Sequence, residues 1–236
     1  MSIKQFGKIY LQKFRYLGAK LFPKKTYAQF GEDIKVQELI GTVNSFVDIG
    51  ANDGYSGSNT FLFAMKGAKG VCFEPVPTIY QMLRSLYQFK REIICFNLGI
   101  SDASKQTEIV SAGVLSYLPE TADESYLKVM DKFLKNKNEK QTIKLAPFAV
   151  AMRAAKFVKE IDLLSIDVEG HELQVLKGID FTQYKFKILV IETHSKVKGE
   201  YVWKNNHLNE INALLSKAGY LKVFENELNS FYLPQK

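Results

Sequence analysis

Short apolar runs alternate along the chain with segments whose apolar residues recur at helical spacing. The apolar runs predict strands near residues 46–49, 70–74, 93–97, 162–167 and 187–192. The segments between them predict helices near residues 57–67, 77–89, 151–158 and 171–177. Strands that alternate with helices are typical of a parallel sheet covered on both faces. The pattern therefore predicts a doubly wound α/β fold.

The C-terminal part of the chain departs from this alternation. Asn206 is placed to cap a helix that ends at Gly219, with apolar positions at Leu208, Ile211, Leu214 and Leu215. Two strand candidates follow, near residues 220–224 and 229–233, close enough to pair as a hairpin. We therefore expect an antiparallel hairpin at the end of the parallel sheet.

Residues 111–145 are a second interruption in the alternation of predicted strands and helices. They contain Ser116-Tyr-Leu-Pro-Glu120 and a lysine-rich run from Lys132 to Lys144. In an open α/β sheet, ligands bind at the carboxyl ends of the strands, where an insert often shapes the substrate pocket. The segment is therefore interpreted as a substrate-side insert, with a solvated surface loop as the alternative.

The first 25 residues combine positive charge with an apolar stripe. They contain seven lysine or arginine residues and no acidic residue. Apolar residues recur at helical spacing before Pro23, at Ile3, Phe6, Tyr10, Phe14, Leu17 and Leu21. Residues 1–25 are thus expected to form a basic amphipathic extension of one domain, residues 26–236. The stripe can dock on that domain or a partner subunit, or lie on an anionic membrane surface, with a disordered tail as the third alternative.

The charge of the rest of the chain is balanced. The formal net charge is +7, and removing the seven basic residues of the extension from 32 leaves 25 basic against 25 acidic residues. This balance argues against a general nucleic-acid-binding surface. Cys72 and Cys95 lie in apolar runs, as buried thiols do, and no apolar stretch approaches the roughly 18 residues of a membrane span. A cytoplasmic protein is expected.

The run Phe46-Val-Asp-Ile-Gly50 predicts a buried strand that opens into a ligand-binding loop. Glycine lets the backbone approach a ligand closely, and Gly54 follows four residues later. Asp48 lies inside the apolar run, where an unpaired carboxylate is costly, so it needs loop amides or a ligand cation. Glu74 ends the next apolar run, where one carboxylate can accept hydrogen bonds from two ribose hydroxyls.

The glycine spacing bears on which nucleotide the loop binds. The dinucleotide fingerprint G-x-G-x-x-G is replaced by Gly50-x-x-x-Gly54 with Asp53 in the loop. Two carboxylates, Asp48 and Asp53, suit a cationic amine or sulfonium better than a pyrophosphate. The loop resembles motif I of S-adenosylmethionine-dependent methyltransferases. The terminal hairpin resembles their seven-stranded sheet, in which the last strand inserts antiparallel.

Ionisable residues gather after two later strands. Asp167, Glu169 and His171 follow the fourth predicted strand, and Glu192 and His194 follow the fifth. Because neighbouring parallel strands end side by side, we expect the two groups to lie within a few ångströms of each other.

A longer motif carries a more specific resemblance. Asp167-Val-Glu-Gly-His-Glu172, followed by Val175-Leu-Lys-Gly178, resembles the signature of the FkbM-type methyltransferases. Gln29-Phe-Gly-Glu32-Asp33 is similar to that family's N-terminal motif, where Gln29 and Glu32 either contribute to the site or brace a helix. The resemblance implies a class I methyltransferase that uses S-adenosylmethionine. Family members mostly O-methylate hydroxyls of sugars, glycolipids, polyketides or other natural products.

The resemblance also implies which residues contact the cofactor. Those around its methionine part are Asp48, Gly50, Ala51, Asn52 and Gly54. Glu74 is expected on the ribose, Asp102 or Ser101 on the adenine, and Asp167 as a further residue that binds the cofactor.

Methyl transfer to a hydroxyl also requires removal of the hydroxyl proton, which a sugar does not lose unaided near neutral pH. His171 or His194 can act as the base, with Glu169 or Glu192 orienting the imidazole.

A divalent ion offers another route. Asp167 and Glu192 occupy strand ends that resemble the magnesium ligands of catechol-type O-methyltransferases, where Mg²⁺ lowers the pKa of the hydroxyl. Thr193 stands where that pattern has an amide or an acid, so base catalysis without a metal is favoured. Two other functions stay open: an NAD(P)-dependent oxidoreductase, and a membrane-tethered binding module without turnover.

Overall fold

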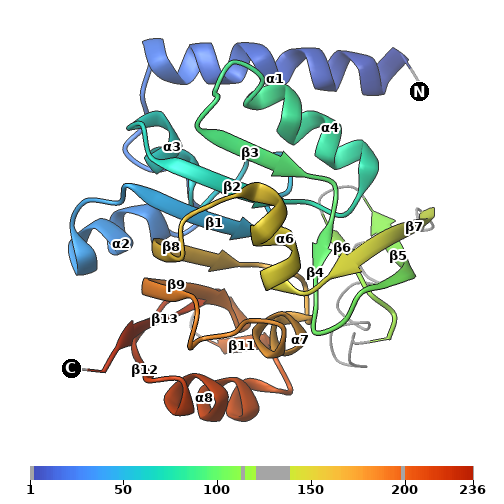
Figure 1. Cartoon of the computed structure of the whole chain (residues 1–236). Coiled ribbons are helices and arrows are strands. Elements are labelled where there is room, and N and C mark those ends of the chain that lie inside the picture. Colours follow the sequence, from blue (N-terminus) through green and yellow to red (C-terminus); the bar gives the residue numbers. More distant parts are fainter. Residues whose placement is uncertain (1–2, 113–114, 121–138, 198–199, 236) are drawn as a thin grey trace.

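A seven-stranded sheet forms the centre of the computed structural model, which describes residues 3–112, 115–120, 139–197 and 200–235 (Figure 1). Its strands are β1 (Ser45–Ile49), β2 (Lys69–Phe73), β3 (Ile93–Phe96), β8 (Glu160–Ile166), β9 (Lys185–Glu192), β12 (Tyr220–Glu225) and β13 (Asn229–Pro234). They lie in the order β12-β13-β9-β8-β1-β2-β3. The five neighbouring strands β9, β8, β1, β2 and β3 pair in parallel. Strand β13 pairs antiparallel with β9 on one side and with β12 on the other. The predicted class I methyltransferase sheet is confirmed.

Helices cover both faces of this sheet. One face carries α1 (Ile3–Leu21), α2 (Glu32–Ile40), α3 (Phe61–Met65) and α4 (Pro77–Leu86). The other carries α6 (Phe148–Ala155), α7 (Glu172–Lys177) and α8 (Leu208–Lys217). Successive side chains of β1 point to opposite faces, so Phe46 packs in the first core and Val47 in the second. This packing holds the carboxyl ends of the parallel strands in register at one edge.

Several helix boundaries differ from the predicted ones. The helix expected near residues 57–67 begins only at Phe61, because the hydroxyl of Ser58 accepts hydrogen bonds from the amides of Thr60 and Phe61 and holds the preceding residues in a turn. Asn206 does not cap α8. The side-chain oxygen of Asn205 instead accepts a hydrogen bond from the His207 amide, and His207 is the residue before the helix.

The segment that interrupts the alternation of strands and helices contributes to a second sheet. It consists of β4 (Gly99–Ile100), β5 (Lys105–Ala112), β6 (Leu115–Tyr117) and β7 (Glu139–Ala146), in the order β4-β7-β5-β6. Strand β5 begins at Lys105, ahead of the predicted boundary at residue 111, and residues 121–138 lie outside the described part of the chain. Ile109, Ile143 and Leu145 pack against Val76 and Ile79 at the start of α4. The small sheet is thereby anchored beside the carboxyl ends of the central strands (Figure 1).

A separate hairpin follows β9. Strands β10 (His194–Val197) and β11 (Glu200–Lys204) pair antiparallel, with a register shift between Ser195 and Lys196. Trp203 on β11 is 5% exposed. The hairpin thus brings a large aromatic ring close to the end of β9.

The N-terminal extension is helical, as predicted, and α1 packs along α4 (Figure 1). Its buried residues are Gln12, Tyr16 and Ala19, whereas the described members of the predicted apolar stripe are exposed. The prediction that this stripe docks on the domain is therefore wrong. The opposite face of α1 makes the contact, because Gln12 and Arg15 reach a buried carboxylate, Asp53. Among the described residues, no helix has both the length and the apolarity that a membrane crossing requires.

Candidate active site

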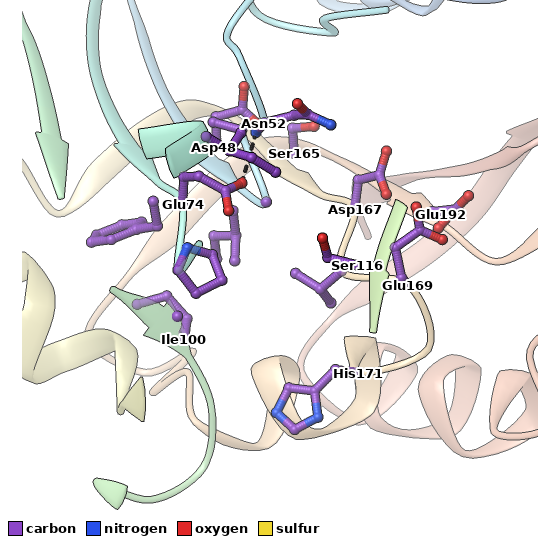
Figure 2. A pocket seen from close by; sticks show the side chains of 18 of the residues that line it. Asp48, Asn52, Glu74, Ile100, Ser116, Ser165, Asp167, Glu169, His171 and Glu192 are labelled. Atoms are coloured by element: carbon purple, nitrogen blue, oxygen red, sulfur yellow. Dashed lines mark hydrogen bonds between the residues drawn. The ribbon is translucent and has the colours of Figure 1, made fainter. Parts of the chain in front are cut away.

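A cavity of about 710 Å³ opens at the carboxyl ends of the central strands, between the main sheet and the small second sheet. The predicted site residues that line it are Gln29, Asp48, Gly50, Ala51, Asn52, Glu74, Asp167, Glu169, His171 and Glu192. They separate into two groups (Figure 2): Asp48, Asn52 and Glu74 on one side, and the Asp167–Glu169–Glu192 cluster on the other. His171 lies apart from both groups.

Gly50 brings the loop after β1 against the end of β8. Its φ of 85° is in the left-handed region, and a Cβ placed there would lie 1.7 Å from the carbonyl oxygen of Asp167. The amides of Gly50 and Ala51 both donate to the carbonyl oxygen of Phe73 on β2. Only glycine permits this close approach of three strand ends, so Gly50 shapes the floor of the cavity.

Asp48 is a buried carboxylate with a hydroxyl partner. The Thr60 hydroxyl donates to its Oδ2 at 2.6 Å, and the residue is 5% exposed. Burial raises the pKa of Asp48 to about 7, more than the hydrogen bond from Thr60 lowers it. A cation in the cavity would favour the ionised form. The group is therefore suited to a positively charged ligand rather than a phosphate.

Glu74 ties the loops after β1 and β2 together. Its Oε2 accepts a hydrogen bond from the Asn52 amide at 3.0 Å, and its Oε1 accepts one from the Val76 amide at 2.8 Å. Burial raises its pKa to about 7. Each carboxylate oxygen can accept a second hydrogen bond, so the geometry fits a pair of ribose hydroxyls. Asn52 has a φ of 51°, which turns its amide toward Glu74.

Asp53 and Gly54 of the same loop lie outside the cavity lining, against the expectation for both residues. The Oδ2 of Asp53 accepts hydrogen bonds from Gln12 at 3.1 Å and Arg15 at 2.8 Å, both on α1. Burial alone would raise the pKa of Asp53, but the amides of Ser56 and Tyr55 and further donors lower it below its ordinary value. A Cβ on Gly54 would lie 2.7 Å from Leu83 of α4, so this glycine permits helix packing. Gly54 is not among the residues that line the cavity.

The Asp167–Glu169–Glu192 cluster has carboxylate oxygens within 4.8 Å of one another. Burial first, and then the charges of Asp167 and Glu169, hold the pKa of Glu192 well above its ordinary range. Burial also raises the pKa of Asp167, whose carboxylate lies within hydrogen-bonding reach of Glu192. Ionisation of one of these carboxylates therefore disfavours ionisation of the other. Among the described residues, Glu192 Oε2 has no hydrogen-bond partner although Glu192 is only 8% exposed.

Glu172 holds the turn that presents this cluster. Its Oε1 accepts hydrogen bonds from the amides of Val168 at 3.2 Å and Gly170 at 3.1 Å, and its Oε2 accepts one from Asn205 at 2.6 Å. Glu169, between those amides, has a φ of 56°, a conformation uncommon for a side-chain-bearing residue. The turn stores strain that its hydrogen bonds offset, which is typical of residues positioned for function.

His171 and His194 do not form the predicted pair beside the carboxylates. The Nε2 of His171 lies 3.0 Å from the Ser101 hydroxyl, and burial, followed by the charge of Lys105, lowers its pKa to about 4. The ring nitrogens of His194 contact the Thr193 hydroxyl at 2.8 Å and the Asn226 carbonyl oxygen at 2.7 Å. His194 is fully buried outside the cavity lining, so its prediction as a base is wrong.

Three further predicted residues also lie outside the cavity lining. Ser101 donates to Asp102 and contacts His171, and the chain presents Gly99 and Ile100 to the cavity instead of this pair. Glu32 is fully buried behind the site. Its carboxylate accepts hydrogen bonds from the Phe30 amide and from the side chains of Asn226 and Asn229, which braces α2 against the β12–β13 turn.

Asn59 and Ser165 are lining residues that were not singled out from the sequence. Asn59 donates to Ser165 at 3.2 Å, and both line the cavity. Ser165 interrupts the apolar run two residues before Asp167, a signal that was available. Ser116 and Leu118 come from the second sheet, and Trp203 comes from the β10–β11 hairpin. Their positions depend on chain segments that meet only in the fold.

Comparisons with known proteins show what the chain is similar to. A family model described as "Methyltransferase FkbM domain" matches residues 48–222. The methyltransferase sdnD of Sordaria araneosa is 26% identical over 74% of this chain and 72% of its own length. The antimetabolite synthetase AmbE of Pseudomonas aeruginosa is 24% identical over 89% of this chain, which spans only 11% of AmbE. The solved structure of the methyltransferase FkbM from Methylobacillus flagellatus is 18% identical, with a TM-score of 0.48, over 81% of this chain and 44% of that one.

The family match includes the loop after β1, the strand-end carboxylates and α8. It excludes the oxidoreductase alternative, and it implies S-adenosylmethionine as the cofactor. The chain therefore belongs to the FkbM family of S-adenosylmethionine-dependent methyltransferases.

Proposed function

We propose that the protein transfers the methyl group of S-adenosylmethionine to a hydroxyl of a sugar, a glycolipid or a related natural product. The observation that carries this proposal is the division of the cavity. Groups suited to a cationic nucleoside occupy one side, and the Asp167–Glu169–Glu192 cluster occupies the other (Figure 2). The second group can take up the proton that a hydroxyl acceptor must lose.

The residues on the first side fit the cofactor. Glu74 is placed to accept hydrogen bonds from the ribose hydroxyls. The carboxylate of Asp48 would stabilise the positive charge of the methionine end. Asn52 is held in place because its backbone N–H donates a hydrogen bond to Oε2 of Glu74. When bound, S-adenosylmethionine supplies a methyl group on a sulfonium that is already activated. The protein then has to align the acceptor and remove its proton.

The acidic cluster is a better proton acceptor than either histidine. His171 has a pKa of about 4, which makes it a weak base at neutral pH, and His194 is outside the cavity lining. A general base works best when its pKa is near the working pH, and burial raises the pKa of both Asp167 and Glu192. We therefore assign the proton transfer to this cluster rather than to a histidine.

The same cluster fits a divalent cation such as Mg²⁺. Hard cations prefer oxygen ligands, and the carboxylates of Asp167, Glu169 and Glu192 are close enough to share one ion. Oε2 of Glu192 is buried and has no hydrogen-bond partner in the described part of the chain, so it is the atom that most needs such a ligand. A cation held there would lower the pKa of a bound hydroxyl.

The wall around the cluster suits a polar ring with an apolar face. Trp203 and Leu118 supply apolar surface, and Ser116 supplies a hydroxyl. Aromatic rings that carry one polar group are well suited to amphipathic ligands such as sugars. This composition supports a glycan or natural-product acceptor over a nucleic acid, as does the absence of excess positive charge in residues 26–236.

Transfer of radiolabelled methyl groups to a panel of sugars, glycolipids and small phenols tests the proposal, with amines included for comparison. Each acceptor is assayed with Mg²⁺ and with EDTA. We expect transfer to a hydroxyl that Glu192→Gln slows at least about 100-fold, while Glu160→Gln, an exposed control, retains activity. Transfer to an amine alone, or full activity of Glu192→Gln, would overturn the proposal. The EDTA arm decides between direct base catalysis and a bound cation.

A further inference from the structure

The outward face of α1 is apolar, although α1 lies on the surface of the protein. Tyr10, Phe14, Leu17 and Leu21 follow one another at intervals of four, three and four residues and are 52%, 57%, 53% and 74% exposed. This spacing places them on one side of a helix. We call these four residues the outer stripe. Phe22, which extends it by one residue, is 81% exposed.

The inner face of α1 is fastened to the domain largely by polar contacts. Gln12 and Arg15 donate to Asp53, and the Ser85 hydroxyl of α4 donates to the carbonyl oxygen of Ile9. Tyr16 adds an edge-on contact with the ring of Phe61. An amphipathic surface helix normally turns its apolar side toward the core. Here that side faces outward, so the outer stripe is built for another apolar partner.

Positive charge lies along one edge of the outer stripe and just beyond the end of the helix. Lys13 and Lys20 recur seven residues apart along one edge of it, and the Lys13 ammonium lies 5.2 Å from the centre of the Tyr10 ring. Lys24 and Lys25, just after the helix, are exposed. Neither α1 nor α4 contains an acidic residue. Arg15 does not add to the positive charge beside the outer stripe, because it forms an ion pair with Asp53.

From these observations, we propose that the outer stripe of α1 docks the protein on an anionic lipid surface, as a peripheral contact. Apolar side chains bordered by lysines match a bilayer interface, where aromatic and aliphatic groups enter the acyl boundary and ammonium groups meet the headgroups.

A second copy of the chain fits this face less well. A symmetric dimer would place the same patch on both subunits, so the lysines of one α1 would meet those of the other. The first 25 residues and α4 offer no carboxylate to neutralise them. The lipid proposal rests on α1 alone and is independent of the acceptor that the enzyme methylates.

Cosedimentation of the full chain with vesicles tests this proposal. We would compare vesicles of phosphatidylcholine with vesicles that also contain phosphatidylglycerol, at low and at physiological salt. The stripe variant combines Phe14→Ser, Leu17→Ser and Leu21→Ser, and the charge variant combines Lys13→Gln, Lys20→Gln and Lys25→Gln. A matched control replaces two exposed apolar residues of β12, Leu221→Ser and Val223→Ser, which are 51% and 48% exposed.

We expect binding to anionic vesicles that falls with added salt, and much weaker binding to neutral ones. The charge variant should lose about fivefold in partitioning for each lysine removed. The stripe variant should lose at least about tenfold, since it removes three apolar anchors, and the β12 control should bind like the wild type. Circular dichroism and cofactor binding of each variant confirm that the fold is retained.

Two outcomes would overturn the proposal. One is equal partitioning of the wild type and the stripe variant into anionic vesicles. The other is a wild-type dimer in sedimentation velocity that the stripe variant dissolves, with no vesicle binding by either protein. The second outcome would assign the outer stripe to a subunit interface instead.

Discussion

The two sides of the active-site cavity differ in how the chain builds them. The side that we assign to the cofactor, called the cofactor side, comes from two short loops, after β1 and β2, whose backbone amides both donate to Glu74. The side that we assign to the acceptor, called the acceptor side, brings together the ends of β8 and β9, the second sheet and the β10–β11 hairpin. The first side consists of local turns, and the second depends on long-range contacts. One side can therefore bind a shared cofactor while the other adapts to a particular acceptor.

The carboxylates on the two sides also differ in the hydrogen-bond donors that the protein supplies to them. Asp48 and Glu74 each have hydrogen-bond donors supplied by the protein, so their carboxylates are fixed before a ligand arrives. The Asp167–Glu169–Glu192 cluster holds three carboxylates close together, and within the described structure Glu192 Oε2 has no donor. The cofactor side is thus organised for binding, whereas the acceptor side is arranged to exchange a proton or hold a cation. Mutations on the two sides should separate affinity from turnover.

The largest effect is expected where the two sides meet, at Gly50. In Gly50→Ala the new Cβ would overlap the Asp167 carbonyl oxygen at 1.7 Å, and the left-handed φ adds strain. We expect loss of cofactor binding and a fall of at least about 3 kcal/mol in the free energy of unfolding. Urea denaturation and calorimetric titration measure both quantities.

Gly219→Ala is the matched control, since Gly219 has a φ of 87° but open space around its Cβ position. It should cost only about 1 kcal/mol, the strain of the left-handed conformation. Equal losses in the two variants would contradict the close approach between the β1 loop and β8.

On the acceptor side, Glu169→Gln should reduce kcat by about 100-fold or more, the range of lost proton transfer or metal binding. The Kd for S-adenosylmethionine should change little, because Glu169 belongs to the far side of the cavity (Figure 2). Single-turnover methyl transfer and calorimetry report the two effects separately. A large rise in Kd with unchanged kcat would place Glu169 on the cofactor side instead.

On the cofactor side, Glu74→Gln should show the reverse pattern. An amide has one acceptor oxygen in place of two, so one loop amide or ribose hydroxyl loses its partner. A loss of about 10-fold to 100-fold in cofactor affinity is expected, since a hydrogen bond to a charged group contributes about 1.5–3 kcal/mol. Turnover at saturating cofactor should remain within a fewfold of the wild type. If kcat falls as far as in Glu169→Gln, the division between the sides does not hold.

Affinity for the cofactor should rise with pH up to about 7. Burial raises the pKa of Asp48 and of Glu74 to about 7, and a cationic ligand with ribose donors favours their ionised forms. Each group that must lose a proton on binding contributes up to about tenfold in Kd per pH unit below its pKa. Calorimetry in buffers of different ionisation enthalpy should therefore detect proton release near pH 6.5. No proton release there would contradict the raised pKa values.

The same groups have an opposite effect on the cofactor-free protein. Their folded-state pKa values exceed the ordinary values of 3.8 and 4.5, so the folded state binds more protons than the unfolded one. Their contribution to stability is present at low pH and is lost as the pH rises toward 7. Cofactor binding should therefore stabilise the protein more at pH 7.5 than at pH 5.5.

The smallest effect is expected from the contact between α1 and the loop after β1. Arg15→Gln removes the ion pair with Asp53, and the Arg15 side chain is 40% exposed, which limits the effect. We expect cofactor affinity to fall by no more than about threefold, in line with the modest energies of partly exposed ion pairs. Lys13→Gln, on the other edge of α1, serves as the control and should leave affinity unchanged. A larger loss in Lys13→Gln would argue against the Asp53 contact as the link.

The sequence predicted the sheet, and it predicted that Asp48, Gly50 and Glu74 line one cavity, because both patterns can be read from short segments of the chain. The strand, the tight glycine turn and Glu74 lie within residues 46–74, and the alternation of apolar runs specifies a parallel sheet. The carboxylates Asp167, Glu169 and Glu192 were also placed together correctly, since the ends of adjacent parallel strands must meet. No side-chain partner had to be known for these inferences.

The predictions that failed depend on partners far away in the chain. The ring of His194 turns toward Asn226, 32 residues later, and Asp53 turns toward Arg15, 38 residues earlier. The spacing of α1 correctly predicted an apolar stripe, but periodicity alone does not reveal which face a helix presents to its own domain. That orientation is set by the polar contacts of Gln12 and Arg15.

A crystal structure with S-adenosylhomocysteine and an added divalent cation would test the division of the cavity most directly. We expect the ribose hydroxyls within hydrogen-bonding distance of Glu74 and the cofactor sulfur facing the Asp167–Glu169–Glu192 cluster. That cluster should remain open to an acceptor. A cofactor whose ribose lies away from Glu74, or which covers Glu169 and Glu192 and leaves no space for an acceptor, would contradict the account.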